Sequence, residues 1–477
     1  MGFDTVIGLE IHLQLKTKSK MFCACPSGAK TDMAPNTAIC PLCSGQPGAL
    51  PVLNKEAVEL AAKAGLVFNA QINETSTFAR KNYFYPDLPK GYQITQDDKP
   101  IITDGYLETL VGEDTTKKIK IVRAHLEEDA GKSMHGDGCS LVDLNRSGVP
   151  LLEIVSAPDL TNVGQAISYL KTLRHMMQWF GISDCDMEKG ELRVDINLSL
   201  KPEGAKKLGT RVEIKNLNSW GAAYLALQYE IKRQSDILSA GGVIEQQTML
   251  WNEKSSRTEP MRSKETAQEY RYFPEPDLPP LVLEAGLLES IKSKMPDTPG
   301  VKKQFYMQQY GLDDYDANFL TSFREVSEYF DAAVAAGATP KTANNWIGTD
   351  ILAKLSSSRD YAICKFSPQE LAALIKYIES GKISGKMAKE IFARAWDEGK
   401  SVKEIVESSG ASQISDEEQL EAWALQAIVD NPKAAADVKA GNTKAIGALV
   451  GSVMKKSAGK ANPAALNKIL HRLIQAL

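Results

Sequence analysis

The stretch Asp4-Thr-Val-Ile-Gly-Leu-Glu-Ile-His-Leu-Gln-Leu-Lys16 alternates between apolar and chemically active side chains. Successive side chains of an extended strand point to opposite faces, so this stretch predicts a strand with two unlike faces. One face is apolar and carries Ile7, Leu9, Ile11, Leu13 and Leu15, and the other carries Glu10, His12 and Gln14. Taken alone, such a strand is most simply explained as half-exposed surface.

Three further stretches repeat this period. Their polar sides carry, in chain order, Arg123, His125 and Glu127; Glu191, Arg193, Asp195, Asn197 and Ser199; and Arg211, Glu213 and Lys215. Their apolar sides carry Val122, Ala124 and Leu126; Leu192, Val194, Ile196, Leu198 and Leu200; and Val212 and Ile214. A solvated face usually carries Lys, Thr, Ser and Gln, whereas these faces repeat carboxylate, imidazole and guanidinium groups. We therefore predict one shared site, the alternative being cross-strand salt bridges on an ordinary surface.

Length and composition are those of a soluble multidomain protein. The chain has 477 residues, 43% of them hydrophobic and 24% charged, which suits two to four domains of roughly 100–200 residues each. No run approaches the roughly 18 apolar residues of a membrane span, and residues 1–7 lack the basic and apolar segments of a signal peptide. We expect a cytoplasmic protein.

The charge is unevenly distributed along the chain. The formal net charge of −4 argues against a protein that coats nucleic acid non-specifically. The last forty residues, however, contain no Asp or Glu and seven cations: Lys439, Lys444, Lys455, Lys456, Lys460, Lys468 and Arg472. This basic tail predicts either a phosphate-binding surface or a solubilising one.

Four of the seven cysteines form two close pairs, Cys23-Ala-Cys25 and Cys40-Pro-Leu-Cys43. Disulfides are rare in the cytosol, and two thiolate pairs around a short loop suit a tetrahedral structural Zn²⁺ site. The alternative is a set of unused reduced thiols.

The periodicity of apolar residues changes near residue 295. Residues 1–294 mix strand-like alternation with helices expected at 55–67, 163–180 and 222–238, and because no regular βαβ rhythm appears, we predict one large α+β domain. From residue 301 apolar residues recur every three to four positions, as in Phe319, Phe323, Val326, Phe330 and Val334, so this part should be helical. A break at 408–413 and a capping start at Ser415 predict two helical domains, 295–408 and 409–477.

A phosphate-handling enzyme needs a glycine-rich cradle or a metal cage with cations around it. Neither GxxxxGK[ST] nor GxGxxG is present. If the protein uses ATP, it must therefore hold the nucleotide on the sheet face through Mg²⁺. The candidate ligands are Glu10, His12, Glu127, Asp195 and Glu213, and the cations expected to neutralise a transferring phosphoryl group are Arg123, Arg193 and Arg211.

Two segments interleave aromatic residues, cations and prolines. Residues 78–96 contain Arg80, Lys81, Tyr83 and Lys90, and residues 270–279 repeat the mixture. Aromatic side chains can stack on exposed bases and cations can meet phosphates, so Arg80, Lys81, Tyr83 and Lys90 are candidate substrate-binding residues. A Pro-rich loop packed over the core would explain the same composition.

Six long motifs occur in a fixed order along the chain. They are residues 6–12 (VIGLEIH), 78–96, 125–132 (HLEEDAGK), 143–155 (DLNRSGVPLLEIV), 213–218 (EIKNLN) and 270–280 (YRYFPEPDLPP), followed in the tail by 451–456 (GSVMKK). Together they resemble the GatB family, the B subunits of aspartyl/glutamyl-tRNA amidotransferases, over essentially the whole chain.

The resemblance implies an antiparallel-sheet cradle domain related to glutamine synthetase, followed by two all-helical domains of which the last contacts tRNA. It implies ATP-dependent phosphorylation of the side-chain carboxylate of Glu-tRNA(Gln) or Asp-tRNA(Asn), after which ammonia displaces phosphate. The implied partners are an amidase subunit and a small third subunit of a heterotrimer, together with tRNA.

The same resemblance assigns residues to roles. Glu10, His12, Glu127, Asp195 and Glu213 would hold Mg²⁺ and the ATP phosphates, with Glu128 as a further ligand. Strand alternation points Glu128 away from Glu127, and we follow the alternation at this position. The four clustered cysteines match the zinc pattern of part of the family. Two other functions remain open: a non-catalytic tRNA-binding scaffold, and a free-standing carboxylate-amine ligase or phosphagen-type kinase of the same fold.

Overall fold

The computed structural model describes residues 2–27, 33–112, 115–136, 138–261, 270–409, 417–440, 442–457 and 461–476. It divides into two compact units, Met1–Thr298 and Pro299–Leu477. Within the described residues, no helix is both long and apolar enough to cross a membrane.

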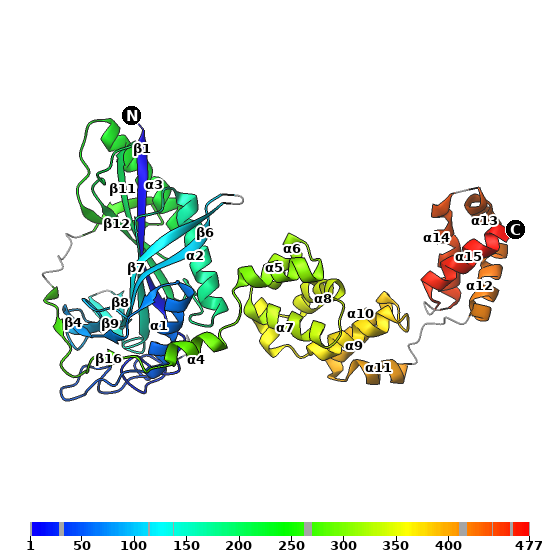
Figure 1. The fold of residues 1–477 in the computed structure, drawn as a ribbon, viewed down its shortest axis with the longest axis horizontal. Coiled ribbons are helices and arrows are strands. Elements are labelled where there is room, and N and C mark those ends of the chain that lie inside the picture. Colours follow the sequence, from blue (N-terminus) through cyan, green and yellow to red (C-terminus); the bar gives the residue numbers. More distant parts are fainter. Residues whose placement is uncertain are drawn as a thin grey trace. The chain divides into compact units, whose positions relative to one another are not determined.

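The first unit is built around a nine-stranded sheet (Figure 1). Neighbouring strands are antiparallel except for β12 and β13, which run parallel. The strand order is β14 (Arg257–Pro260), β13 (Gln247–Asn252), β12 (Val212–Leu217), β11 (Leu192–Pro202), β1 (Phe3–Gln14), β10 (Pro150–Ser156), β7 (Thr116–Glu128), β6 (Ile102–Leu110) and β2 (Gln71–Ile72).

Helices cover the apolar face of this sheet. The core joins inward-facing strand residues such as Leu9, Ile11 and Ile196 to buried residues of α1 (Lys55–Val67), α2 (Val163–Trp179) and α3 (Trp220–Ser239). Burial of this apolar area, which stabilises by about 25 cal/mol per Å², fixes which face of each strand points inward. A fourth helix, α4 (Leu287–Lys294), follows near the end of the unit. The three helices expected between residues 55 and 238 are confirmed.

Three small sheets flank the large one. They are β15 (Phe273–Pro274) with β4 (Ala79–Asn82) and β5 (Tyr92–Thr95); β16 (Leu281–Val282) with β3 (Thr75–Ser76); and β8 (Lys132–Gly136) with β9 (Cys139–Asp143). The first of them pairs the two aromatic and cationic segments, because Phe273 lies directly opposite Arg80. Segments far apart in the sequence thus become neighbours in one sheet.

One expected alternation is wrong in detail. Val122 was assigned to the apolar face of its strand, but its side chain is 41% exposed. The register between β10 and β7 shifts by one residue here, since Val155 pairs with Arg123 while Ser156 pairs with Ile121. A β-bulge at Val122 leaves that residue outside the alternation and restores the expected parity from Ala124 onward.

In the second unit, the described regular elements are helices and helical turns. One group forms a core from Tyr306 to Ile405 and another forms a core from Leu420 to Ile474. The first group comprises α5 (Pro299–Tyr310), α6 (Asp314–Leu320), α7 (Arg324–Ala335), α8 (Pro340–Trp346), a π-helical turn (Ile347–Ile351), two 3₁₀ turns (Leu352–Lys354 and Ser358–Ile363), α9 (Pro368–Glu379), α10 (Gly385–Glu398) and α11 (Val402–Ser409). The second comprises α12 (Glu417–Asp430), α13 (Pro432–Lys439), a 3₁₀ turn (Thr443–Ala445), α14 (Ile446–Lys456) and α15 (Pro463–Ala476).

The prediction of mixed α and β structure with one large sheet is confirmed. The run that begins at Phe319 is divided between two helices, because α6 ends at Leu320 with Thr321 as its C-cap, and α7 begins at Arg324 with Phe323 as its N-cap. Of the expected break at 408–413, the first two residues belong to α11, and residues 410–413 lie outside the described residues, as do the expected cap at Ser415 and Lys460 of the basic tail.

Candidate active site

A row of polar side chains crosses the centre of the nine-stranded sheet. His125 on β7 lies opposite Glu153 on β10, Glu153 lies opposite His12 on β1, and His12 lies opposite Arg193 on β11. Residues directly opposite one another in antiparallel strands share a face. Four strands therefore contribute to one continuous polar surface, on the face away from the helices that cover the core.

The neighbouring row belongs to the same surface. Val155 lies opposite Arg123 and also opposite Glu10, which in turn lies opposite Asp195. The register thus brings together side chains from β7, β1 and β11, three of the strands that the sequence alternation had marked, and from β10, which it had not marked.

Two groups of potential metal ligands overlap at His12. Among the described residues, Glu10, His12 and Asp195 form one group and His12, Glu127 and Glu153 form the other, with the ligand atoms of each group within 4.8 Å of one another. The Nε2 atom of His12 lies 3.4 Å from Glu153 Oε2 and 3.6 Å from Glu127 Oε1. Several carboxylates gathered in so small a volume fit a hard divalent cation such as Mg²⁺, which prefers oxygen ligands.

The buried charges perturb one another strongly. Burial, reinforced by the charge of Glu153, raises the pKa of Glu127 to about 7. Burial opposes protonation of His12, but its hydrogen bond with Glu153 and the charges of Glu127 and Glu153 outweigh it and raise the pKa of His12 to about 9. Burial lowers the pKa of His125 to about 4. Such opposed shifts in one cluster are typical of a functional site.

Glu153 is held in its charged form. Burial alone would raise the pKa of this carboxyl, but the neighbouring imidazoles of His125 and His12 lower it well below its ordinary value. Its Oε2 atom lies 3.5 Å from His125 Nε2 as well as 3.4 Å from His12 Nε2. Glu153 is therefore the fixed negative charge around which the cluster is arranged.

Two of the four expected substrate residues lie beside this cluster. The ammonium of Lys81 lies 4.8 Å from the ring centre of Tyr270. Burial lowers the pKa of Lys81, but nearby negative charges, above all that of Glu127, outweigh burial and raise it. The ring of Tyr83 packs edge-on against that of Tyr270, 6.1 Å between centres, and burial followed by the charge of Glu127 raises the pKa of its hydroxyl.

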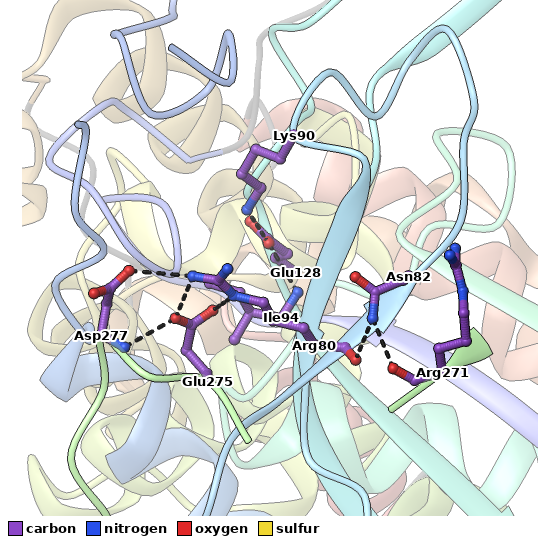
Figure 2. A network of polar contacts seen from close by, with 8 residues as sticks. All are labelled: Arg80, Asn82, Lys90, Ile94, Glu128, Arg271, Glu275 and Asp277. Atoms are coloured by element: carbon purple, nitrogen blue, oxygen red, sulfur yellow. Dashed lines mark hydrogen bonds and ion pairs between the residues drawn. The ribbon is translucent and has the colours of Figure 1, made fainter. Parts of the chain in front are cut away.

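The other two expected substrate residues are engaged in ion pairs. Arg80 forms a two-pronged pair with Glu275, and Lys90 pairs with Glu128, as Figure 2 shows. Glu128 also accepts a hydrogen bond from the backbone N–H of Ile94 at 3.0 Å. The structure therefore places Glu128 apart from the cluster around His12, as strand alternation predicts and the family match does not.

The remaining expected residues lie at the margins of the polar surface. Glu213 is buried, accepts a hydrogen bond from Thr248 at 2.9 Å and lies 3.4 Å from the ammonium of Lys215, and Lys215 also pairs with Asp195. Glu213 thus joins the surface through Lys215 and belongs to neither ligand group. Arg211 is exposed and precedes β12.

The comparisons with known proteins cover the whole chain. Residues 5–289 match the protein family described as "GatB/GatE catalytic domain", and residues 328–474 match the "GatB domain". The aspartyl/glutamyl-tRNA(Asn/Gln) amidotransferase B subunit of Elusimicrobium minutum is 53% identical over 99% of both chains. The corresponding B subunits of Persephonella marina and Thermotoga maritima are each 46% identical over 100% of both chains.

The chain belongs to the GatB family. The resemblance inferred from the six sequence motifs is thereby confirmed.

The sequence alternation did not identify two candidate site residues of this GatB family member. Glu153 interrupts the apolar run 149–155, and such a lone carboxylate in a strand buried on both faces is the signal that could have found it. Asp129, which follows β7, pairs with Arg193 at 2.9 Å between Oδ2 and Nη2. No periodic pattern marks Asp129, because it lies beyond the end of the strand.

The four clustered cysteines of this GatB family member meet at one point. The Sγ atom of Cys43 lies 3.7 Å from that of Cys23 and 3.7 Å from that of Cys40, and all four Sγ atoms, including that of Cys25, lie within 4.8 Å of one another. Four thiolates at about 2.3 Å from a tetrahedral Zn²⁺ would be separated by about 3.8 Å. The cluster can therefore hold a structural metal.

A buried lysine stabilises a thiolate in this cluster. The side chain of Lys20 is buried and donates to Cys43 Sγ at 3.3 Å and to the carbonyl oxygen of Ala38 at 2.8 Å. The hydrogen bond from Cys23, supported by the Lys20 ammonium, lowers the pKa of the Cys43 thiol to about 4, although burial opposes this shift. A thiolate is the form that binds a metal.

Proposed function

We propose that this chain is the transamidating subunit of a tRNA-dependent amidotransferase. It uses ATP to phosphorylate the side-chain carboxylate of Glu-tRNA(Gln) or Asp-tRNA(Asn), and ammonia then displaces phosphate to give the amide. The observation that carries the proposal is the convergence of His12, Glu127 and Glu153 on one sheet face, with Glu10 and Asp195 beside them. Membership of the GatB family supports the substrate class.

The chemistry explains why ATP is needed. A carboxylate is a poor acyl electrophile because its leaving group would be oxide, and transfer of a phosphoryl group converts it into an acyl phosphate with phosphate as leaving group. The attack of ammonia on the acyl carbon then forms the C–N bond as the C–O bond to phosphate breaks. The acyl phosphate must be shielded from water until ammonia arrives.

The ligand groups provide places for Mg²⁺. Glu10, His12, Glu127, Asp195 and Glu153 would hold it, and when bound it would neutralise charge on the ATP phosphates. Glu213 would act from the margin, through Lys215. Glu128 is left out of the proposed metal site, because its carboxylate is engaged by Lys90 and Ile94.

Cations of the chain itself surround the carboxylates. Arg193 lies in the same cross-strand row as His12, and Lys81 approaches from β4, where the negative charges of Glu127 and Glu153 favour its charged form. We propose that Arg193 and Lys81 stabilise the negative charge that spreads over the oxygens of a transferring phosphoryl group. Arg123, which is exposed and lies in the row of Glu10, would contribute from β7.

The domains, the aromatic residues and the clustered cysteines would each have a role in the same reaction. The sheet domain, residues 1–294, would be the glutamine-synthetase-like cradle that receives the aminoacyl 3′ end, residues 295–408 a helical domain, and residues 409–477 a tRNA-binding tail. The aromatic residues Tyr83, Tyr270 and Tyr272 suit the stacking of unpaired bases. An amidase subunit would supply ammonia and a small third subunit would complete a heterotrimer. Cys23, Cys25, Cys40 and Cys43 would hold one structural Zn²⁺.

The test is release of ADP by the assembled amidotransferase in the presence of mischarged tRNA. Glu127→Gln keeps the shape of the side chain and removes its charge, and we expect it to lower the turnover rate by about 100-fold. Glu108→Gln is the matched control, because this carboxylate lies on β6 of the same sheet but pairs with Lys118 at the surface.

Each alternative function makes a different prediction in this assay. Retained turnover in Glu127→Gln would favour a non-catalytic tRNA-binding scaffold. Substantial ATP turnover by the isolated chain with free glutamate would favour a free-standing carboxylate-amine ligase. Either result would overturn the proposal.

A further inference from the structure

A two-pronged ion pair joins β4 of the small sheet to Glu275, the residue that follows β15. Arg80 on β4 donates from Nε to Glu275 Oε2 and from Nη2 to Glu275 Oε1, each at 2.7 Å, as Figure 2 shows. The carboxylate of Glu275 has no exposed surface. The Arg80 guanidinium also lies 4.2 Å over the ring of Tyr92 on β5. Two parallel hydrogen bonds fix the geometry of such a pair as well as contributing energy.

A second contact ties the same segment to the same strand. Asn82, two residues beyond Arg80, donates from Nδ2 to the carbonyl oxygens of Arg271 at 2.9 Å and of Tyr270 at 3.3 Å. Arg271 adopts a left-handed backbone with φ of 46°, which disfavours a residue with a side chain by about 1–3 kcal/mol unless its surroundings hold it. The segment 270–277 is therefore anchored to β4 near both of its ends.

Lys81 lies between these two anchors, on the opposite face of β4 from Arg80. Its ammonium lies 4.8 Å from the ring centre of Tyr270, and the rings of Tyr270 and Tyr272 pack edge-on with centres 6.0 Å apart. Both tyrosines belong to the anchored segment. The position of the segment thus determines where the ring that contacts the Lys81 ammonium lies.

We propose that Arg80 is a positioning residue: its ion pair with Glu275 holds the segment 270–277 against β4, so that Tyr270 and Tyr272 keep the Lys81 ammonium directed at the carboxylate cluster. This replaces the expectation that Arg80 binds the substrate. A guanidinium already held by a buried carboxylate, by Asp277 and by the Tyr92 ring has its charge compensated within the protein.

The inference rests on the proposed function, because Lys81 is assigned there to the transferring phosphoryl group. A displacement of about 1 Å at a catalytic group can slow a reaction by about 100-fold. Loss of the clamp, that is, of the Arg80–Glu275 ion pair that holds the segment 270–277, should therefore lower the turnover rate more than the substrate affinity.

The experiment compares Arg80→Gln and Glu275→Gln in the assembled amidotransferase. We expect kcat for ADP release to fall by about 10-fold to 100-fold, with KM for ATP and for mischarged tRNA within about 2-fold of the wild-type values. Asp277→Asn is the matched control, because its carboxylate is 37% exposed and receives a single contact from Arg80. We expect this variant to change kcat by less than about 2-fold.

A second readout needs no turnover. The rate of acetylation of Lys81 by acetic anhydride, followed by mass spectrometry, should rise by about 10-fold in Arg80→Gln as the tyrosines move away. Lys20, which is fully buried elsewhere in the same unit, reports unfolding and should stay unreactive.

The double variant Arg80→Gln/Glu275→Gln separates positioning from simple destabilisation. It removes the unpaired buried charge, so its Tm should return toward the wild-type value while kcat stays low. Recovery of kcat along with Tm would overturn the clamp, as would unchanged Lys81 reactivity. A raised KM for tRNA with unchanged kcat in Arg80→Gln would indicate that Arg80 binds the substrate, and would overturn its positioning role. An inactive wild-type complex would count against the proposed function and not against the clamp.

Discussion

His12 and Glu153 lie directly opposite each other across the strand pair β1–β10, with 3.4 Å between His12 Nε2 and Glu153 Oε2. On its other side, Glu153 lies opposite His125 of β7, at 3.5 Å. One carboxylate is therefore held between two imidazoles in the middle of the sheet. This arrangement makes Glu153 the centre of the candidate active site.

Replacement of Glu153 by Gln should lower tRNA-dependent ADP release by about 100-fold. The cluster would lose both the negative charge that binds His12 and a proposed ligand of Mg²⁺. Mg²⁺ affinity, measured by titration calorimetry with the metal alone, should fall in the same variant. Glu108→Gln, the surface carboxylate control, should match the wild type in both measurements. Wild-type Mg²⁺ affinity in Glu153→Gln would remove Glu153 from the metal site.

The stability of the metal-free chain should fall as the pH rises from about 7 to 10. The folded pKa of His12 is raised from 6.5 to about 9, so its protonated form contributes stability below pH 6.5 that is lost as the pH rises through 9. Thermal unfolding in the presence of EDTA measures this. Lysines and thiols also titrate here, so the comparison is with His12→Gln, which should show a shallower decline. Identical slopes for the two proteins would contradict the shift.

Removal of the metal from the cysteine cluster should loosen the segment around it. Treatment with a zinc chelator should lower Tm by about 5 °C or more, because the four Sγ atoms would lose the ion that holds them together. The wild-type protein should contain one zinc per chain by elemental analysis, and Cys43→Ser should contain markedly less. Cys185→Ser, which changes a cysteine outside the cluster, should keep its zinc. Zinc-free wild-type protein with an unchanged Tm would rule out a structural metal here.

The buried pair Lys90–Glu128 should be structural. Its side chains are only 6% and 3% exposed, so Lys90→Met alone leaves a buried carboxylate without its partner and should cost about 3–5 kcal/mol in the free energy of unfolding. The double variant Lys90→Met/Glu128→Leu removes both charges and should restore most of that loss. Denaturant titrations of the three proteins measure the effect. Equal stability of Lys90→Met and wild type would show that Lys90 is available to a ligand.

The basic tail should bind tRNA through its exposed lysines. Lys444, Lys455 and Lys468 are among the exposed lysines of the tail; Lys456 is exposed as well but pairs with Asp430, and Arg472 pairs with Glu417 and Glu421. The variant in which Lys444, Lys455 and Lys468 are all replaced by Gln should weaken tRNA binding and reduce the dependence of log Kd on log salt by about 1 for each lost phosphate contact. Lys456→Gln is the control and should have less effect. An unchanged salt dependence in the triple variant would remove the tail from the tRNA site.

Strand alternation predicted much of the candidate site because the period of two is a local property of an extended chain. Glu10 and His12, on one strand, and Glu127, on another, lie where alternation put them. The bulge at Val122 was not predictable, since it depends on the register between β7 and β10. Neither was the role of Glu153, whose strand is apolar on both sides and shows no alternation.

In the aromatic and cationic segments, too, the sequence predicted only part of what the structure shows. Their composition predicted phosphate and base contacts for Arg80, Lys81, Tyr83 and Lys90 alike. Only the folded chain separates Lys81 and Tyr83, beside the carboxylates, from Arg80 and Lys90, each paired with a buried acid. The partners of Arg80 and Lys90 lie far away in the sequence, so no local pattern predicts these pairs.

The amino-acid sequence by itself determined the family, the mixture of a large sheet with helices, and the chemical character of each strand face. These follow from motifs and from periodicities that act over a few neighbouring residues. The tertiary structure alone decided which carboxylates meet, because cross-strand register places Glu153 between His12 and His125 and turns Glu128 toward Lys90. Pairing of distant segments is set by burial of the whole apolar face, and no single strand contains that information.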